Sequence, residues 1–170
     1  LRALGANPVI TNPTPTPSRF DFLLADLPGV DRTAEAVKEI RRAQMVLVLD
    51  IADLGRLGML HDAVRDQGVP VACIDHHVSA GTLPDGPRYV DPTASATGEL
   101  VVELAEANGW AIGASAARAL YVAVLTDTGG FRFSNTKPRV LRVAADLLEC
   151  GVDPEEIYLQ VYANAPEGRH

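Results

Sequence analysis

The sequence contains little cysteine and no long apolar run. Cys73 and Cys150 are too few for a disulfide framework, and both lie inside apolar stretches. We therefore interpret them as reduced core residues of a cytoplasmic protein. The longest apolar runs, such as residues 45–49, are far too short to cross a bilayer. No charged start followed by an apolar core and a small-residue cleavage site is present, which disfavours secretion and indicates no membrane partner.

Basic residues are also scarce. Fifteen Lys and Arg against 22 Asp and Glu give a formal net charge of −7. This balance argues against a protein that binds long duplex nucleic acid by phosphate neutralisation alone. A small phosphorylated substrate stays compatible with it, because bound divalent cations can supply positive charge. No G-x-G-x-x-G follows a predicted strand, so a plain Rossmann-like dinucleotide binder is a weak interpretation.

The apolar residues that are present predict an α/β fold. The chain has 170 residues, of which 47% are hydrophobic, enough for one globular domain with a core. Residues 45–49 and 70–74 form continuous apolar runs typical of strands buried on both faces, and residues 56–66 between them have helical spacing. We expect a mainly parallel sheet flanked by helices, with a helical C-terminal end.

Further elements follow from periodicity and capping residues. We expect a short strand over residues 7–11, a loop over residues 81–92, and helices over residues 33–42, 99–108 and 114–125. Thr136 is the predicted cap of the next helix, with Pro138 in its first turn. Asp153 is the predicted cap of the last helix.

Polar side chains follow the two predicted parallel strands at the point where each ends. Asp50 follows the first strand, and Asp75, His76 and His77 follow the second. Ligands of open α/β sheets bind beyond the carboxyl ends of the strands, and neighbouring strands lie about 4.8 Å apart. Asp127 is a further candidate, because it follows an apolar helix and precedes two glycines.

Each candidate also has an ordinary structural interpretation. Asp50 can be a turn or cap residue, the adjacent histidines can simply be solvated, and Asp127 can cap the turn after it. Three metal-capable groups that end three apolar elements nevertheless favour a metal site. Carboxylates with neutral imidazole suit Mn²⁺ or a similar ion. A metal pair about 3.5–4 Å apart can activate a water and bind the oxygens of a phosphoester.

Three ordered motifs resemble those of the DHH phosphoesterases, the family named for an Asp-His-His signature. The matching segments are Cys73-Ile74-Asp75-His76-His77, Leu49-Asp50-Ile51-Ala52-Asp53 followed by Arg56-Leu57-Gly58, and Leu125-Thr126-Asp127-Thr128-Gly129-Gly130-Phe131 followed by Phe133, Asn135 and Thr136. Within the family, the pattern around Asp91, Ser95, Thr97 and Glu99 is most similar to the bacterial branch that acts as oligoribonuclease and 3′-phosphoadenosine-5′-phosphate phosphatase.

The resemblance implies an enzyme that hydrolyses short oligoribonucleotides or 3′-phosphoadenosine 5′-phosphate by metal-activated water. It implies two Mn²⁺ ions, with Mg²⁺ or Co²⁺ as alternatives. Asp50 would bridge the two ions, and His76 and Asp127 would complete the shell of one of them.

The resemblance also implies residues that act on the substrate. His77 would be the catalytic histidine that faces the substrate phosphate, and Asp75 would orient a histidine through its ring N–H. Arg56 is a weaker substrate-binding candidate, because an ion pair or a packed stem explains it equally well.

Two parts of the family pattern have no counterpart here. The first motif, which supplies one His and two Asp ligands, is absent, and so is the C-terminal substrate-binding domain. We therefore expect residues 1–170 to be a partial DHH catalytic domain that is weakly active or inactive in isolation. A cyclic-dinucleotide phosphodiesterase and a non-catalytic nucleotide-binding module stay open as alternatives, as does a homodimer.

Overall fold

The computed structural model describes residues 2, 5–66, 68–78 and 82–163. The chain divides into two compact units. Unit 1 comprises Leu1–Cys73 with Ser79–Arg88, and unit 2 comprises Ile74–Val78 with Tyr89–His170.

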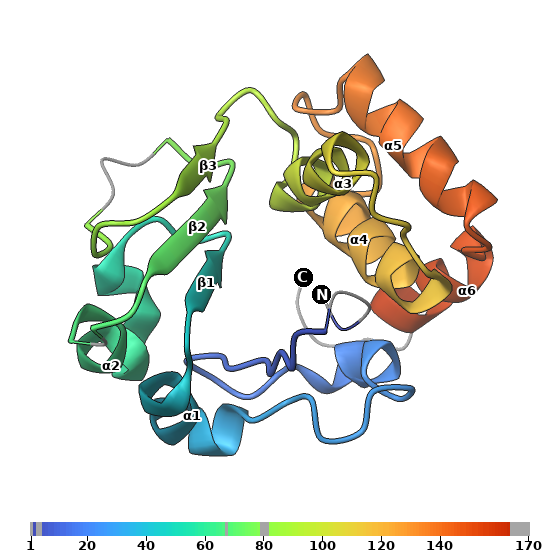
Figure 1. The fold of residues 1–170 in the computed structure, drawn as a ribbon. Helices are drawn as coiled ribbons and strands as arrows, with labels where there is room; N and C mark the ends of the chain where they lie inside the picture. Colours follow the sequence, from blue (N-terminus) through green and yellow to red (C-terminus); the bar gives the residue numbers. More distant parts are fainter. Residues whose placement is uncertain (1, 3–4, 67, 79–81, 164–170) are drawn as a thin grey trace, which may run out of the picture. The chain divides into compact units, whose positions relative to one another are not determined.

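Three strands form one sheet in the order β1-β2-β3. They are β1 (Val46–Leu49), β2 (Val71–Asp75) and β3 (Arg88–Val90), and their arrows run the same way in Figure 1. The prediction of a parallel sheet flanked by helices is confirmed. The loop predicted over residues 81–92 is wrong in part, because it contains β3. All three residues of β3 are exposed, so this strand has no apolar run by which to recognise it.

The helices of unit 1 are short. The predicted helix over residues 33–42 is confirmed as η3 (Thr33–Glu35) continued by α1 (Ala36–Arg42). Residues 56–66 do not form one helix but a 3-10 segment, η4 (Leu54–Leu60), and then α2 (His61–Arg65). Gly58 causes the break, because its φ of 52° and ψ of −125° are not helical. A further 3-10 segment, η2, spans Ser18–Leu23.

Two expectations for unit 1 are corrected. The strand predicted over residues 7–11 is only a single parallel bridge between Ile10 and Asp31. Strand β1 is not buried on both faces, because Val48 is buried whereas Leu47 and Leu49 are exposed. The core of unit 1 lies where helices and strands meet, and it is formed mainly by Ala36, Ile40, Val48, Leu54, Leu57, Leu60, Val64, Val71 and Cys73.

Unit 2 consists mainly of helices that pack on one another. They are α3 (Thr97–Ala107), α4 (Ala114–Asp127), α5 (Pro138–Glu149), α6 (Pro154–Tyr158) and the π-helical turn η5 (Leu159–Ala163) (Figure 1). Helix α4 packs against both α3 and α5. A Cβ at Gly98 in α3 would lie 3.0 Å from the Cβ of Ala123 in α4, so glycine permits this close approach. None of the helices in the described ranges is both long and apolar enough to span a membrane.

The caps predicted for α5 and α6 differ in outcome. Asp153 caps α6, since its carboxylate accepts from the main-chain N–H groups of Glu155 at 2.9 Å and Glu156 at 3.1 Å. The prediction for Thr136 is wrong, because α5 begins one residue later than the pattern suggested. Its N-cap is Lys137, which makes no side-chain capping bond in the described structure, and Pro138 occupies the first turn.

Candidate metal site

His77 is held by a buried carboxylate at the end of β2. Asp75 is fully buried, and its Oδ1 accepts the main-chain N–H of His77 at 3.0 Å. The same oxygen lies 2.7 Å from Nδ1 of the His77 ring. A proton on Nδ1 would complete that bond and direct Nε2 away from Asp75. The side chain of His77 is 39% exposed.

His76 points towards the end of α4. Its Nε2 lies 3.6 Å from Oδ2 of Asp127, and its Nδ1 lies 3.4 Å from the main-chain oxygen of Ala94. The His76 side chain is 17% exposed and that of Asp127 is 35% exposed. The separation of 3.6 Å is longer than a hydrogen bond, and it brings an imidazole nitrogen and a carboxylate oxygen close enough to bind one cation.

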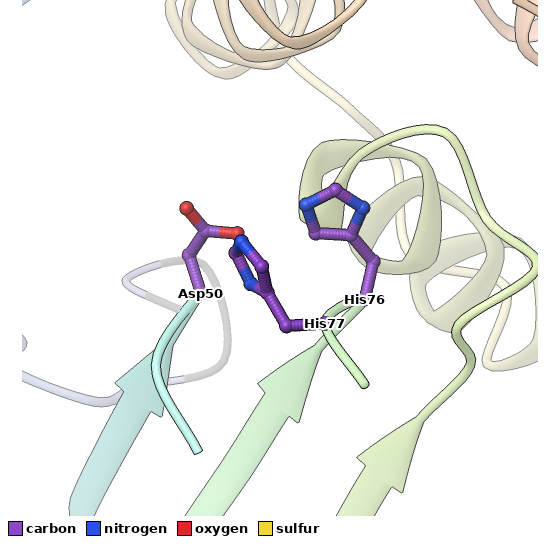
Figure 2. A group of neighbouring side chains, drawn as sticks. All are labelled: Asp50, His76 and His77. Carbon is purple, nitrogen blue, oxygen red and sulfur yellow. The ribbon is translucent and has the colours of Figure 1, made fainter. Parts of the chain in front are cut away.

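Asp50 follows β1, the sheet neighbour of β2. Its φ of 65° is left-handed, a conformation that Asp adopts more readily than most residues. Asp50, His76 and His77 each offer a potential ligand atom, a carboxylate oxygen or an imidazole nitrogen (Figure 2). Left-handed backbone in a non-glycine residue is often found at functional sites.

The loop after Asp127 has an unusual backbone. Gly129, Gly130 and Phe131 have successive φ values of 58°, 68° and 63°. The hydroxyl of Thr128 donates to Val124 O at 2.7 Å and accepts from the N–H of Phe131 at 3.1 Å. These bonds tie the left-handed turn to the last turn of α4, and so they fix the backbone beside Asp127.

Arg56, the weaker substrate candidate, lies exposed in η4 of unit 1. Its charge helps to lower the pKa of Asp53, after the larger effects of hydrogen bonds from the N–H of Gly55 and the hydroxyl of Thr82. A contact with Asp53 is the ordinary interpretation of Arg56, and a role in substrate binding stays a prediction.

The donor atoms fit a hard or borderline divalent cation. The group that the described residues form consists of carboxylate oxygens and imidazole nitrogens. The nearby thiol of Cys73 is buried and donates to Ile51 O at 3.6 Å, so it belongs to the core. Oδ2 of Asp75 is buried without a hydrogen-bond partner in the described ranges. An orphaned carboxylate oxygen of this kind is stabilised by positive charge nearby.

A second polar cluster lies in unit 2, on α3, α5 and the residues around the end of β3. Arg139 forms ion pairs with Asp91 at 3.2 Å, with the fully buried Glu99 at 2.9 Å, and with Glu103. The phenol of Tyr89 donates to Glu103 at 2.8 Å, and this bond raises the pKa of Tyr89. The sequence placed Asp91 and Glu99 in one family-like pattern but did not indicate that Arg139 pairs with them; an acidic residue at position 99, among the first residues of an apolar helix, is the signal for a buried partner.

The sheet, with its Asp-His-His triplet at the carboxyl end of the central strand and Asp127 close by, defines a DHH-type phosphoesterase fold. No family model matches the sequence. The sequence is 37% identical over 150 residues to the bifunctional oligoribonuclease and PAP phosphatase NrnA of Thermus thermophilus, covering 83% of this chain and 41% of that protein. It is 31% identical over 152 residues to the Bacillus subtilis protein of the same name, covering 88% of this chain and 45% of that protein.

A solved structure supports the same fold. An exopolyphosphatase-related protein from Bacteroides fragilis superposes with a TM-score of 0.88 at 24% identity, covering 98% of this chain and 50% of that chain. The chain belongs to the DHH phosphoesterase family. It spans less than half the length of the two curated relatives.

Proposed function

We propose that this chain is part of a Mn²⁺-dependent phosphoesterase that hydrolyses short oligoribonucleotides and 3′-phosphoadenosine 5′-phosphate. The observation that carries the proposal is the arrangement of His76 facing Asp127 at 3.6 Å, beside a His77 ring held by Asp75. Two relatives more than 30% identical are named bifunctional oligoribonuclease and PAP phosphatase, and this supports the substrate class. Residues 1–170 would form part of the catalytic domain.

His76, Asp127 and Asp50 would hold the metal, and all three offer ligands that Mn²⁺ accepts. Bound divalent ions would supply charge neutralisation for the phosphate and lower the pKa of water. This chemistry suits a protein with a net charge of −7, which has little positive charge of its own for a phosphate.

His77 would be the catalytic residue that meets the substrate. Asp75 binds its Nδ1 side, so His77 would donate to a phosphate oxygen through an N–H at Nε2, with both ring nitrogens protonated. A hydrogen bond from His77 to that oxygen would stabilise the negative charge that develops as the phosphoester breaks. Because Asp75 fixes the ring beforehand, the donor needs little reorganisation during the reaction.

The test uses the full-length natural protein with Mn²⁺ and compares the wild type with Asp127→Asn. The matched control is Asp146→Asn, which changes an exposed aspartate on α5. We expect Asp127→Asn to lower the release of mononucleotides from a diribonucleotide by about 100-fold or more, since a ligand is lost. The control should retain wild-type activity.

The same assay is run with three substrates: a diribonucleotide, 3′-phosphoadenosine 5′-phosphate and a cyclic dinucleotide. Preference for the cyclic dinucleotide would replace the proposed substrate class with that alternative. Full activity in Asp127→Asn would contradict the site itself, and a wild-type protein that hydrolyses none of the three would favour a non-catalytic module.

A further inference from the structure

The turn at Ala94 and Ser95 contacts the ring of one candidate metal ligand, His76, and the loop that follows another, Asp127. The turn and both ligands lie in unit 2. The main-chain oxygen of Ala94 lies 3.4 Å from Nδ1 of His76. Ser95 is linked to the loop that follows Asp127 by hydrogen bonds between residues 40 positions apart in the sequence. One turn thus meets both the His76 ring and the segment that carries Asp127.

Asn135 makes that link. The hydroxyl of Ser95 donates to the main-chain oxygen of Asn135 at 2.6 Å. The side-chain amide of Asn135 donates in return to Ser95 O and to Asp127 O, both at 3.1 Å. A single amide group therefore bridges the Ser95 turn to the backbone of the candidate ligand Asp127.

The Ser95 turn is itself anchored by a buried charge. Ser95 and Glu99 are each 1% exposed, and the N–H of Ser95 donates to Glu99 Oε2 at 2.7 Å. The other oxygen of Glu99 is paired with Arg139 at 2.9 Å. Removing the partners of a buried carboxylate strongly destabilises the fold. The pairing of Glu99 therefore allows the turn few alternative positions.

We propose that Asn135 is a positioning residue that sets Asp127 in register with His76 for metal binding. The proposal rests on the proposed metal site. The amide of Asn135 donates both to the backbone of Asp127 and to the turn that contacts His76. Asn135 therefore does more than close a loop. Partners outside the metal shell that orient its ligands typically change metal affinity by about 10- to 100-fold.

The variant that tests this role is Asn135→Asp. It keeps the size of the side chain but replaces the donating nitrogen with an oxygen that faces two carbonyl oxygens. The matched control is Asn108→Asp at the end of α3, where the amide likewise donates to a main-chain oxygen, that of Leu104 at 2.7 Å. Both variants exchange one amide for one carboxylate in unit 2, and the control lies outside the network described above.

Two measurements on the full-length natural protein separate positioning from general stability. The dissociation constant for Mn²⁺ is measured by electron paramagnetic resonance of the free ion, well below the unfolding temperature of each variant. The visible absorption spectrum is recorded with saturating Co²⁺, since this spectrum reports the coordination geometry and does not depend on how stable the fold is. Asn135→Asp should weaken Mn²⁺ binding by at least about 10-fold and change the Co²⁺ spectrum. Asn108→Asp should stay within about 2-fold of the wild type with an unchanged spectrum.

The outcomes distinguish this inference from the proposed function. If Asn135→Asp binds Mn²⁺ as tightly as the wild type, or keeps the wild-type Co²⁺ spectrum, Asn135 has no positioning role. If the wild type binds Mn²⁺, loses affinity in Asn135→Asp and yet hydrolyses no phosphoester, the inference holds and the proposed function fails. A wild-type protein that binds neither ion would overturn both.

Discussion

Oδ1 of Asp75 contacts His77 twice, through the main-chain N–H at 3.0 Å and through ring Nδ1 at 2.7 Å. Asp75 is completely buried, and its Oδ2 has no hydrogen-bond partner in the described part of the chain. A buried carboxylate held in this way is costly unless charge or donors surround it. We infer that its role is to orient His77 rather than to stabilise the strand.

Replacing this carboxylate by an amide tests the orientation. In Asp75→Asn the carbonyl oxygen can still accept both bonds from His77, so the unfolding temperature should change little. The acceptor is now neutral and stabilises a charged His77 less, so kcat should fall by about 10- to 100-fold. Asp75→Ala should also lower stability by about 1–3 kcal/mol, because it removes the acceptor of both hydrogen bonds from His77. Equal kcat in the wild type and Asp75→Asn would contradict the role of the charge.

The left-handed backbone at Asp50 predicts that glycine and alanine at this position differ in stability but not in metal affinity. Glycine adopts a φ of 65° without strain, whereas alanine does not. Both Asp50→Gly and Asp50→Ala remove the carboxylate and should lose Mn²⁺ affinity alike. Asp50→Gly should be more stable than Asp50→Ala by about 1 kcal/mol, measured by urea unfolding without metal. Equal stability of the two variants would show that position 50 relaxes out of the left-handed region.

The turn after Asp127 depends on glycine for two separate reasons. A Cβ at Gly129 would clash with the ring of Phe133, and the φ of 58° is left-handed. Gly129→Ala should therefore destabilise the protein by about 2 kcal/mol or more in thermal unfolding. Adding Phe133→Ala removes the clash but not the backbone strain, so the double variant should recover only part of the loss. Full additivity of the two substitutions would show that the ring does not restrict position 129.

Asp91 predicts a pH-dependent contribution to stability. The hydroxyl and N–H of Thr93 donate to its carboxylate, at 2.7 and 2.8 Å, and these bonds lower the pKa of Asp91, with a smaller effect from Arg139. A lowered pKa in the folded state stabilises the fold above the unfolded value, near pH 4, and this stability is lost as the pH falls through the folded pKa.

The variant Thr93→Val tests this dependence by removing the hydroxyl. It should be less stable than the wild type at pH 7, and the difference in urea midpoint should shrink below about pH 4 as Asp91 becomes protonated. Thr126→Val is the control, because the hydroxyl of Thr126 donates to the neutral carbonyls of Val122 and Ala123. Its effect should not vary between pH 7 and pH 3. A pH-independent loss in Thr93→Val would contradict the assignment to Asp91.

Much of the fold could be predicted because its strands and helices carry local patterns. The cores of β1 and β2 are continuous apolar runs, and the helices α3 to α5 have apolar residues at helical spacing. The strand at residues 88–90 lacked such a pattern, because its residues are exposed and only pairing with β2 makes them a strand. The break at Gly58 also needed the three-dimensional backbone, since an isolated glycine is often tolerated in a helix.

The candidate site could be predicted only as far as strand ends and motifs locate it. Asp50 and the triplet at positions 75–77 were located by the rule that ligands lie beyond the carboxyl ends of strands. Asn135 belongs to the motif that follows Asp127, but its bridging role could not be inferred from the motif. Its hydrogen bonds join residues 40 positions apart, and no local periodicity encodes such a separation.

Asp127 is the last residue of α4, a helix with no basic residue in its last turn. A negative charge at the C-terminal end of a helix opposes the helix dipole and costs about 0.3–1 kcal/mol. Asp127→Asn should therefore raise the unfolding temperature of the metal-free protein by about 1–3 °C. It should also lose most of the added stability that Mn²⁺ gives the wild type, since that gain depends on the dissociation constant.

Asp146→Asn, in the last turn of α5, is the matched variant: it should gain similar stability and keep the full response to Mn²⁺. The measurement is thermal unfolding with EDTA and with Mn²⁺. A lower unfolding temperature for metal-free Asp127→Asn would mean that the pairing of Asp127 with His76 outweighs the dipole, and that this carboxylate stabilises the fold instead of being retained for the metal.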